Sequence, residues 1–68
     1  MNYLEALNYG NSILKIGNIK SYLIDSELLL SKVLDIPREQ ILINLKKKID
    51  IKKLNLFKNL LLRRKKNE

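Results

Sequence analysis

Two carboxylates near the middle of the chain, Asp25 and Glu27, are the side chains best suited to acid-base chemistry. A general acid and a general base that act on one substrate must point to the same place. Residues two apart on a helix point to different sides, so this spacing argues against such a pair. Acidic side chains are also favoured near the start of a helix by the helix dipole. We therefore expect both carboxylates to face solvent or to form local ion pairs.

Other groups that could do chemistry are scarce. The sequence has no Cys and no His, which removes disulfides, thiolate nucleophiles and the usual ligands of zinc, haem and iron-sulfur clusters. The serines have only Lys, Asp and Glu as neighbouring bases. Gly10 and Gly17 are seven residues apart and follow no predicted strand, so they do not form a phosphate-binding loop. We expect no catalytic, cofactor-binding or metal-binding residue in this chain.

The stretch Tyr22–Leu34, YLIDSELLLSKVL, is the element that carries the two carboxylates. At about 100° per residue, its apolar side chains cover most of the helix circumference and leave a narrow polar strip of Asp25 and Lys32. A helix that is hydrophobic nearly all round is typically buried among others. The sequence therefore predicts an all-α fold, a small bundle of about four to five short helices around this central helix.

The first helix of this bundle is predicted from Asn2 to Ile16. Asn2 and Glu5 have the spacing of a capping box, in which each side chain bonds the backbone of the other residue. Gly10 lies on the apolar face, where we expect it to allow close approach to the central helix. Gly17 is predicted to end the helix in the left-handed conformation.

Two more helices are predicted after the central one. Pro37 suits the start of a short third helix, Arg38 to Leu45, with Ile41, Leu42 and Leu45 turned inward. Ser21 and Asp50 are the expected N-caps of the central and last helices. The last helix runs from Ile51 to about Lys66. Its predicted core stripe is Leu54, Phe57 and Leu61, and its predicted basic face is Lys52, Asn55, Asn59, Arg63 and Lys66.

The 68 residues fit one domain, and their net charge is +7. Such an excess of positive charge suggests an acidic partner, although a Lys-rich soluble surface explains it equally well.

No stretch approaches the ~20 apolar residues of a membrane span, and the N-terminus lacks the features of a signal peptide, so we expect a cytoplasmic location without a membrane partner.

Three functions are compatible with a basic helical bundle. One is a helix-turn-helix that binds nucleic acid through the third helix. Against it, the segment REQILINL is short and apolar in its middle. Another is membrane or partner binding by the last helix, whose apolar stripe is however needed by the bundle. The third is a protein-binding accessory domain.

Two stretches favour the third function. DSELLLSKVLDIPREQILIN, residues 25–44, resembles the opening pattern of the HemK-type glutamine N5-methyltransferases, which methylate peptide-chain release factors. FKNLLLRRKKNE, residues 57–68, resembles the segment that closes the same N-terminal domain. The chain departs from the family pattern at four positions. Ser26 replaces the usual Ala, Asp35 and Asn67 each replace the usual Gly, and Pro37 replaces a polar capping residue.

The resemblance implies that residues 1–68 are a single helical N-terminal substrate-recognition domain and that the Rossmann-like methyltransferase domain of the family is absent. In the family that second domain binds S-adenosylmethionine and methylates the Gln of the release factor's Gly-Gly-Gln loop. The implied partners are a peptide-chain release factor and the catalytic domain, and nucleic acid is an unlikely partner. We hypothesise that Lys46, Lys47, Lys48 and Arg63 contribute to binding the release factor.

Overall fold

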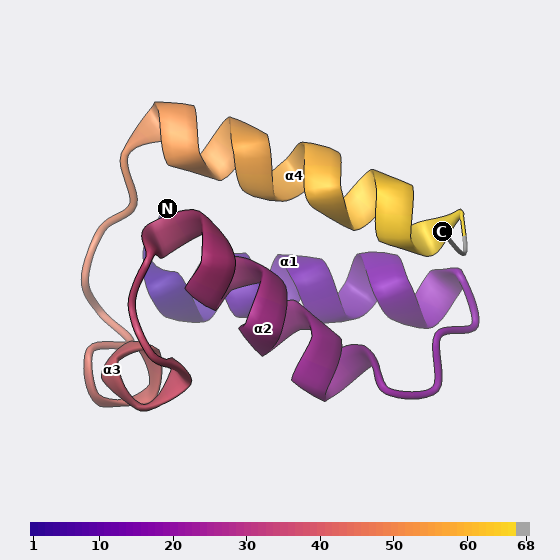
Figure 1. The fold of residues 1–68 in the computed structure, drawn as a ribbon, viewed down its shortest axis with the longest axis horizontal. Helices are drawn as coiled ribbons and strands as arrows, with labels where there is room; N and C mark the ends of the chain where they lie inside the picture. The colour runs from indigo at the N-terminus through magenta and orange to yellow at the C-terminus, as the bar shows by residue number, and fades with distance from the viewer. Residues whose placement is uncertain (67–68) are drawn as a thin grey trace.

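The computed structural model describes residues 1–66, and Asn67 and Glu68 of the family resemblance lie outside this range. Four helices make up the described chain, and the sequence prediction of a small all-α bundle is confirmed. They are α1 (Tyr3–Ile16), α2 (Tyr22–Leu34), α3 (Arg38–Ile43) and α4 (Ile51–Lys65). Helices α1, α2 and α4 each pack against the other two, and α3 packs on α2 at one end of the bundle (Figure 1).

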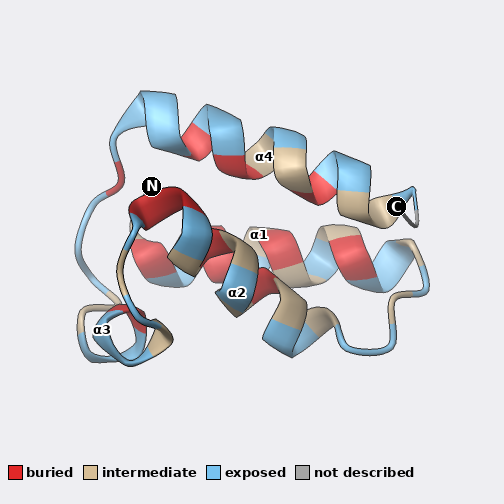
Figure 2. Cartoon of the chain, in the orientation of Figure 1, coloured by how far each residue is buried: buried red, intermediate tan, exposed pale blue. Residues whose placement is uncertain are grey.

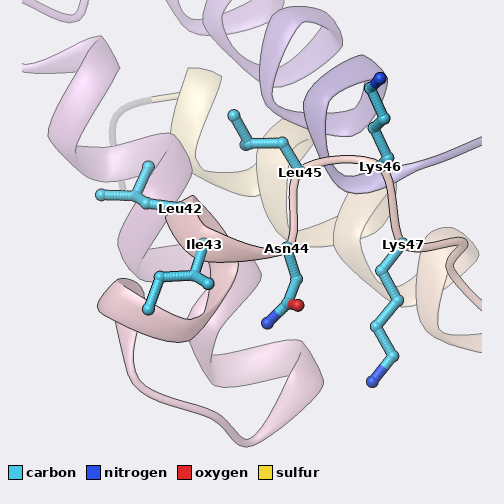
Figure 3. Close-up of a pocket in the computed structure, with 6 residues that line it drawn as sticks. All are labelled: Leu42, Ile43, Asn44, Leu45, Lys46 and Lys47. Carbon is cyan, nitrogen blue, oxygen red and sulfur yellow. The ribbon is translucent and has the colours of Figure 1, made fainter.

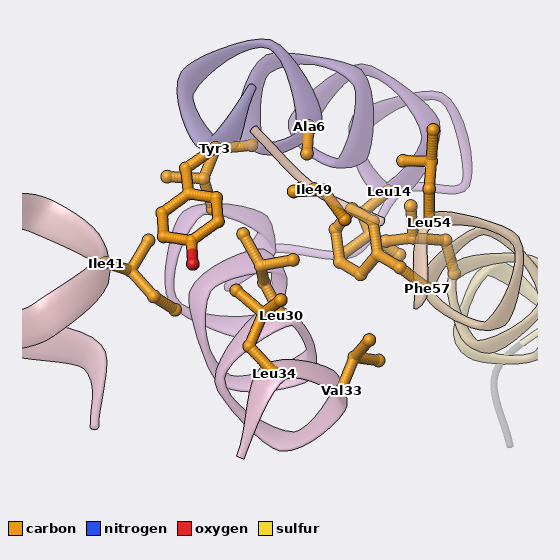
Figure 4. Close-up of a cluster of buried hydrophobic side chains, with 12 residues drawn as sticks. Tyr3, Ala6, Leu14, Leu30, Val33, Leu34, Ile41, Ile49, Leu54 and Phe57 are labelled. Atoms are coloured by element: carbon orange, nitrogen blue, oxygen red, sulfur yellow. The ribbon is translucent and has the colours of Figure 1, made fainter. Parts of the chain in front are cut away.

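The core lies between α1, α2 and α4, with one contribution from α3 and one from the segment before α4 (Figures 2 and 4). Leu14, Leu30, Phe57 and Leu61 are fully buried, as the helical periodicity predicts for their faces. The complete buried set is Tyr3, Ala6, Leu7, Leu14, Leu30, Val33, Leu34, Ile41, Ile49, Leu54, Phe57 and Leu61. With a single Phe, this core depends on interdigitated aliphatic side chains.

Helix α2 contacts all three other helices, but the prediction that it is buried nearly all round is wrong. Leu23, Ile24 and Leu28 are each about half exposed, at 54%, 51% and 50%. The reason is that α1, α3 and α4 cover one face of α2, and no helix of residues 1–66 covers its outer face (Figure 2).

The start of α1 is held by the predicted capping box. The Asn2 side chain accepts a hydrogen bond from the Glu5 amide at 2.8 Å, and the Glu5 carboxylate accepts one from the Asn2 amide at 2.9 Å. The Tyr3 and Leu4 amides have no partner within the helix, and they donate to backbone carbonyls of the segment between α3 and α4. All four N-terminal donors therefore have partners, as a stable helix end requires.

The turn after α1 differs from the prediction by one residue. Gly17 has φ −79°, whereas Asn18 adopts the left-handed conformation at φ 62°. Asn18 donates to Lys15 O and Ile19 donates to Leu14 O, which is the pattern of a Schellman cap. Gly17 is needed for space instead, because a Cβ there would lie 2.7 Å from Lys65 Cγ and 3.2 Å from the Lys65 carbonyl oxygen.

Helix α3 ends at Ile43, two residues before its predicted end, and only part of its predicted inward face is buried. Ile41 is fully buried and Leu45 packs against the core, but Leu42 is 47% exposed. Asn44 ends the helix, and its side-chain amide donates to the Gln40 carbonyl at 2.8 Å. The residues after Ile43 leave the helix to pair with the start of α1.

Ser21 and Asp50 occupy the predicted N-cap positions, but neither side chain bonds a helix amide. The Ser21 hydroxyl donates to the Asp25 carboxylate at 3.1 Å instead. Helix α4 begins after Asp50 although the Asp50 carboxylate accepts no hydrogen bond from a helix amide. Ile49 before it and Leu54 after it are both buried in the core, and they have the spacing of a hydrophobic staple.

Left-handed backbone also ends α2. Asp35 has φ 58° and ψ 42°, a conformation that suits Gly better than Asp. The Ile36 amide donates to the Ser31 carbonyl, and the Ser31 hydroxyl donates to the Ile36 carbonyl. These bonds fix the sharp turn that sends the chain into α3.

At Gly10, helix α1 lies close to both other long helices. A Cβ built there would lie 3.0 Å from Ser26 Oγ on α2, 3.1 Å from Phe57 Cζ and 3.3 Å from Leu61 Cδ2 on α4. The predicted role of Gly10 in close approach to α2 is therefore confirmed, and it extends to α4.

Ser26 is fully buried against Gly10, and its hydroxyl has no hydrogen-bond partner. An unpaired buried hydroxyl costs free energy, and Ala is also the better helix former. We expect Ser26→Ala to raise the free energy of unfolding by about 1 kcal/mol, measured by urea unfolding. Ser31→Ala is the matched control on the same helix and should destabilise, because it removes the bond to Ile36. Destabilisation by Ser26→Ala of the same size would show that the hydroxyl has a partner in solution.

Candidate partner-binding surface

Residues 44–50 join α3 to α4 and are called the link below. The predicted site residues Lys46, Lys47 and Lys48 lie on this link, and all three are exposed. The Tyr3 amide donates to the Lys47 carbonyl at 2.9 Å, and the Leu4 amide donates to the Leu45 carbonyl at 2.9 Å. Lys48 forms an isolated antiparallel bridge with Asn2. The lysines therefore project from a backbone that is fixed to the start of α1.

Arg63, the fourth predicted site residue, is exposed on the last turn of α4. It shares the outer face of this helix with Lys52, Asn55, Asn59 and Lys66, which are all exposed as predicted. Leu56 and Leu62 are also about half exposed on α4.

The structure does not bring Arg63 together with the three lysines. Arg63 lies twelve positions after Ile51 on α4, which corresponds to about 18 Å along a helix. The link with its lysines and the C-terminal end of α4 lie at opposite ends of the molecule in Figure 1. This distance exceeds the screening length of about 8 Å at physiological salt, so the charge of Arg63 adds little to the potential at the three lysines.

Positive charge is concentrated in the last third of the chain. Residues 46–66 hold ten of the fourteen Lys and Arg residues and one acidic residue, Asp50. Residues 1–45 hold four basic and five acidic residues. Three of the ten basic residues make contacts within the bundle: Arg64 pairs with Asp25, the Lys58 ammonium lies 5.4 Å from the Tyr9 ring centre, and Lys65 lies against Gly17. The others give the link and the outside of α4 a positive potential.

The carboxylates Asp25 and Glu27 are partly buried, and each forms an ion pair that joins α2 to another helix, so the expected solvent exposure or local ion pairing is wrong. Asp25 also accepts the local hydrogen bond from the Ser21 hydroxyl. Both Arg64 Nε and Arg64 Nη2 lie 3.0 Å from Asp25 Oδ2, which ties α2 to the end of α4. Arg38 Nη2 lies 2.7 Å from Glu27 Oε1, which ties α2 to the start of α3. Arg64 is thus held in an ion pair, whereas its neighbour Arg63 is exposed.

An open hollow lies beside the first lysines of the link, and the sequence analysis did not identify it. Its volume is about 560 Å³, and its lining residues are Leu42, Ile43, Asn44, Leu45, Lys46 and Lys47 (Figure 3). Ile43 is 73% exposed, the largest exposed fraction among the exposed large apolar side chains of residues 1–66. The sequence signal for this hollow is the run of apolar residues at the end of α3. No other helix of residues 1–66 covers Leu42 and Ile43 there.

The geometry of α3 gives no support to a helix-turn-helix. A recognition helix must present several side chains to base edges. This helix has six residues, Ile41 is fully buried, and Arg38 is paired with Glu27. The exposed Glu39 in its first turn would repel phosphate.

Within residues 1–66 no group of three or more acidic side chains could hold a metal ion. In the same range, no helix has the length and apolarity needed to cross a membrane.

Comparison with known protein families places the chain in one of them. Residues 5–68 match the family model of the PrmC N-terminal domain. The chain belongs to the PrmC N-terminal domain family. No curated protein and no solved structure gives a significant match. The family suggested by the sequence resemblance is thereby confirmed, and the exposed lysines, Arg63 and the hollow are features of a PrmC N-terminal domain.

Proposed function

We propose that this PrmC N-terminal domain is the recognition domain of an S-adenosylmethionine-dependent protein-glutamine N5-methyltransferase. Its partner is a peptide-chain release factor, and the reaction at the Gly-Gly-Gln loop is carried out by a separate Rossmann-like domain that binds S-adenosylmethionine. The chain itself binds and does not catalyse. Family membership over residues 5–68 is the observation that carries this proposal.

The charge distribution supports a role in binding an acidic protein surface. The three link lysines are exposed and project from backbone bonded to α1, so little backbone ordering is needed when a partner binds. Exposed charges at the edge of an interface act mainly on the rate of association and on its salt dependence. The link lysines therefore attract and orient the release factor before close contacts form.

Charge reversal of all three lysines, Lys46→Glu, Lys47→Glu and Lys48→Glu together, is expected to slow association with a release factor by about tenfold or more at low salt. Association rates are measured by stopped-flow fluorescence over a series of salt concentrations. The salt dependence should also become weaker, because fewer unlike charges attract the partner.

The matched control is Lys15→Glu, Lys20→Glu and Lys32→Glu together, which makes the same change in net charge at exposed positions outside the link. This variant should slow association much less. Equal slowing by the two variants would show that only total charge matters. No binding by the unchanged domain, or equally tight binding to a short duplex DNA, would contradict the proposed function.

A further inference from the structure

We propose that the hollow between α3 and the link is a docking site for one apolar side chain of an acidic segment on the release factor. This inference rests on the proposed function and deepens it, because it assigns a specific contact to a surface otherwise defined by charge alone.

The apolar part of the hollow is formed by the end of α3. Leu42 is 47% exposed and Ile43 is 73% exposed, so apolar surface on both side chains remains open to water. Burying such surface under a partner side chain contributes about 25 cal/mol for each Å² removed from water. The hollow is open rather than enclosed, which suits a side chain on a protein surface better than a small molecule.

The polar part of the hollow is formed by Asn44, Lys46 and Lys47. In Figure 3 the side chains of Asn44 and Lys47 extend to the same side of the chain, with Ile43 beside Asn44. No acidic residue lines the hollow. A segment that inserts an apolar side chain next to Ile43 would place a neighbouring carboxylate near the Lys47 ammonium, whereas Lys46 extends to the opposite side of the chain (Figure 3). Such an occupant is acidic and amphipathic.

Several hydrogen bonds hold the hollow in shape before any partner arrives. The Lys47 amide donates to the Asn44 carbonyl at 2.9 Å, and the Leu45 and Lys47 carbonyls accept from α1. The Ile49 amide donates to the Met1 carbonyl at 3.0 Å. Because the backbone on both sides of the lysines is fixed, binding loses little conformational entropy.

Ile43→Asn tests the apolar contact without changing charge. The expected result is a dissociation rate from the release factor about tenfold higher, with the association rate and its salt dependence unchanged. The matched control is Ile51→Asn, because Ile51 is 68% exposed at the start of α4 and does not line the hollow. Its dissociation rate should change by less than about twofold. Leu42→Asn provides a second variant inside the hollow, and thermal unfolding confirms that each protein is folded.

The outcomes separate the two proposals. Binding by the unchanged domain that neither Ile43→Asn nor Leu42→Asn weakens would overturn the docking inference and leave the proposed function standing. Equal effects of Ile43→Asn and Ile51→Asn would overturn it as well. Failure of the unchanged domain to bind the release factor would overturn the proposed function and this inference with it.

Discussion

Leu30→Ala is expected to lower the free energy of unfolding by about 2–5 kcal/mol, which is comparable with the whole stability of so small a domain. Leu30 is fully buried on α2, in the core shared with α1 and α4. The substitution removes buried apolar atoms and leaves a cavity that tightly packed neighbours cannot fill. Urea unfolding followed by circular dichroism measures the change.

The matched control for Leu30→Ala is Leu28→Ala on the same helix. Leu28 is 50% exposed, so its removal should cost less than about 1 kcal/mol. Equal losses for the two variants would mean that the outer face of α2 is covered in solution. Retention of cooperative unfolding by Leu30→Ala with an unchanged midpoint would show that α2 is peripheral.

Gly10→Leu is expected to cost about 3 kcal/mol or more, because the bundle has no room for a side chain at this position. Even a single Cβ would approach Ser26, Phe57 and Leu61 to between 3.0 and 3.3 Å. A leucine would force α1 away from both α2 and α4. The expected observation is loss of cooperative thermal unfolding, monitored by circular dichroism.

Ser12→Leu is the control for Gly10→Leu, because it introduces the same side chain on the exposed face of α1. Its unfolding midpoint should change little, within about 0.5 kcal/mol. A stable, cooperatively folded Gly10→Leu protein would show that the three helices do not approach each other as closely as described.

Local patterns in the sequence were sufficient for most of the fold. The capping box of Asn2 and Glu5, the end of α2 before Pro37 and the core stripe of α4 depend on residues close together in the chain. Each was predicted from spacing alone, because helix caps and helical periodicity are local properties. The packing role of Gly10 was also predictable, since a glycine on an apolar helix face costs helix propensity without another benefit.

Features that depend on residues far apart were not predictable. The sequence shows that α2 is apolar nearly all round, but not that its neighbours cover only one face. The ion pair of Asp25 with Arg64 joins residues 39 positions apart. The left-handed residue after α1 is Asn18 rather than Gly17, and Gly17 instead leaves room for Lys65 on α4.

The candidate site was partly visible in the sequence. The lysine run at 46–48 and the excess of basic residues up to position 66 can be read directly. The separation of the lysines from Arg63 follows from the length of α4, which the sequence predicted, and from the direction of α4, which it did not. The hollow beside Ile43 lies where α3 ends, two residues earlier than predicted. The chain leaves the helix there and pairs with the start of α1, which is a contact between distant residues.

The most direct test of the proposed recognition role is a titration of the isotope-labelled domain with an unlabelled release factor, following the backbone amide resonances. We expect shifts from the release factor, and not from a short duplex DNA, clustered at residues 42–48 and on the outer face of α4. Shifts confined to the exposed face of α1, or shifts caused by the DNA alone, would contradict the proposal that this basic side of the bundle recognises a release factor.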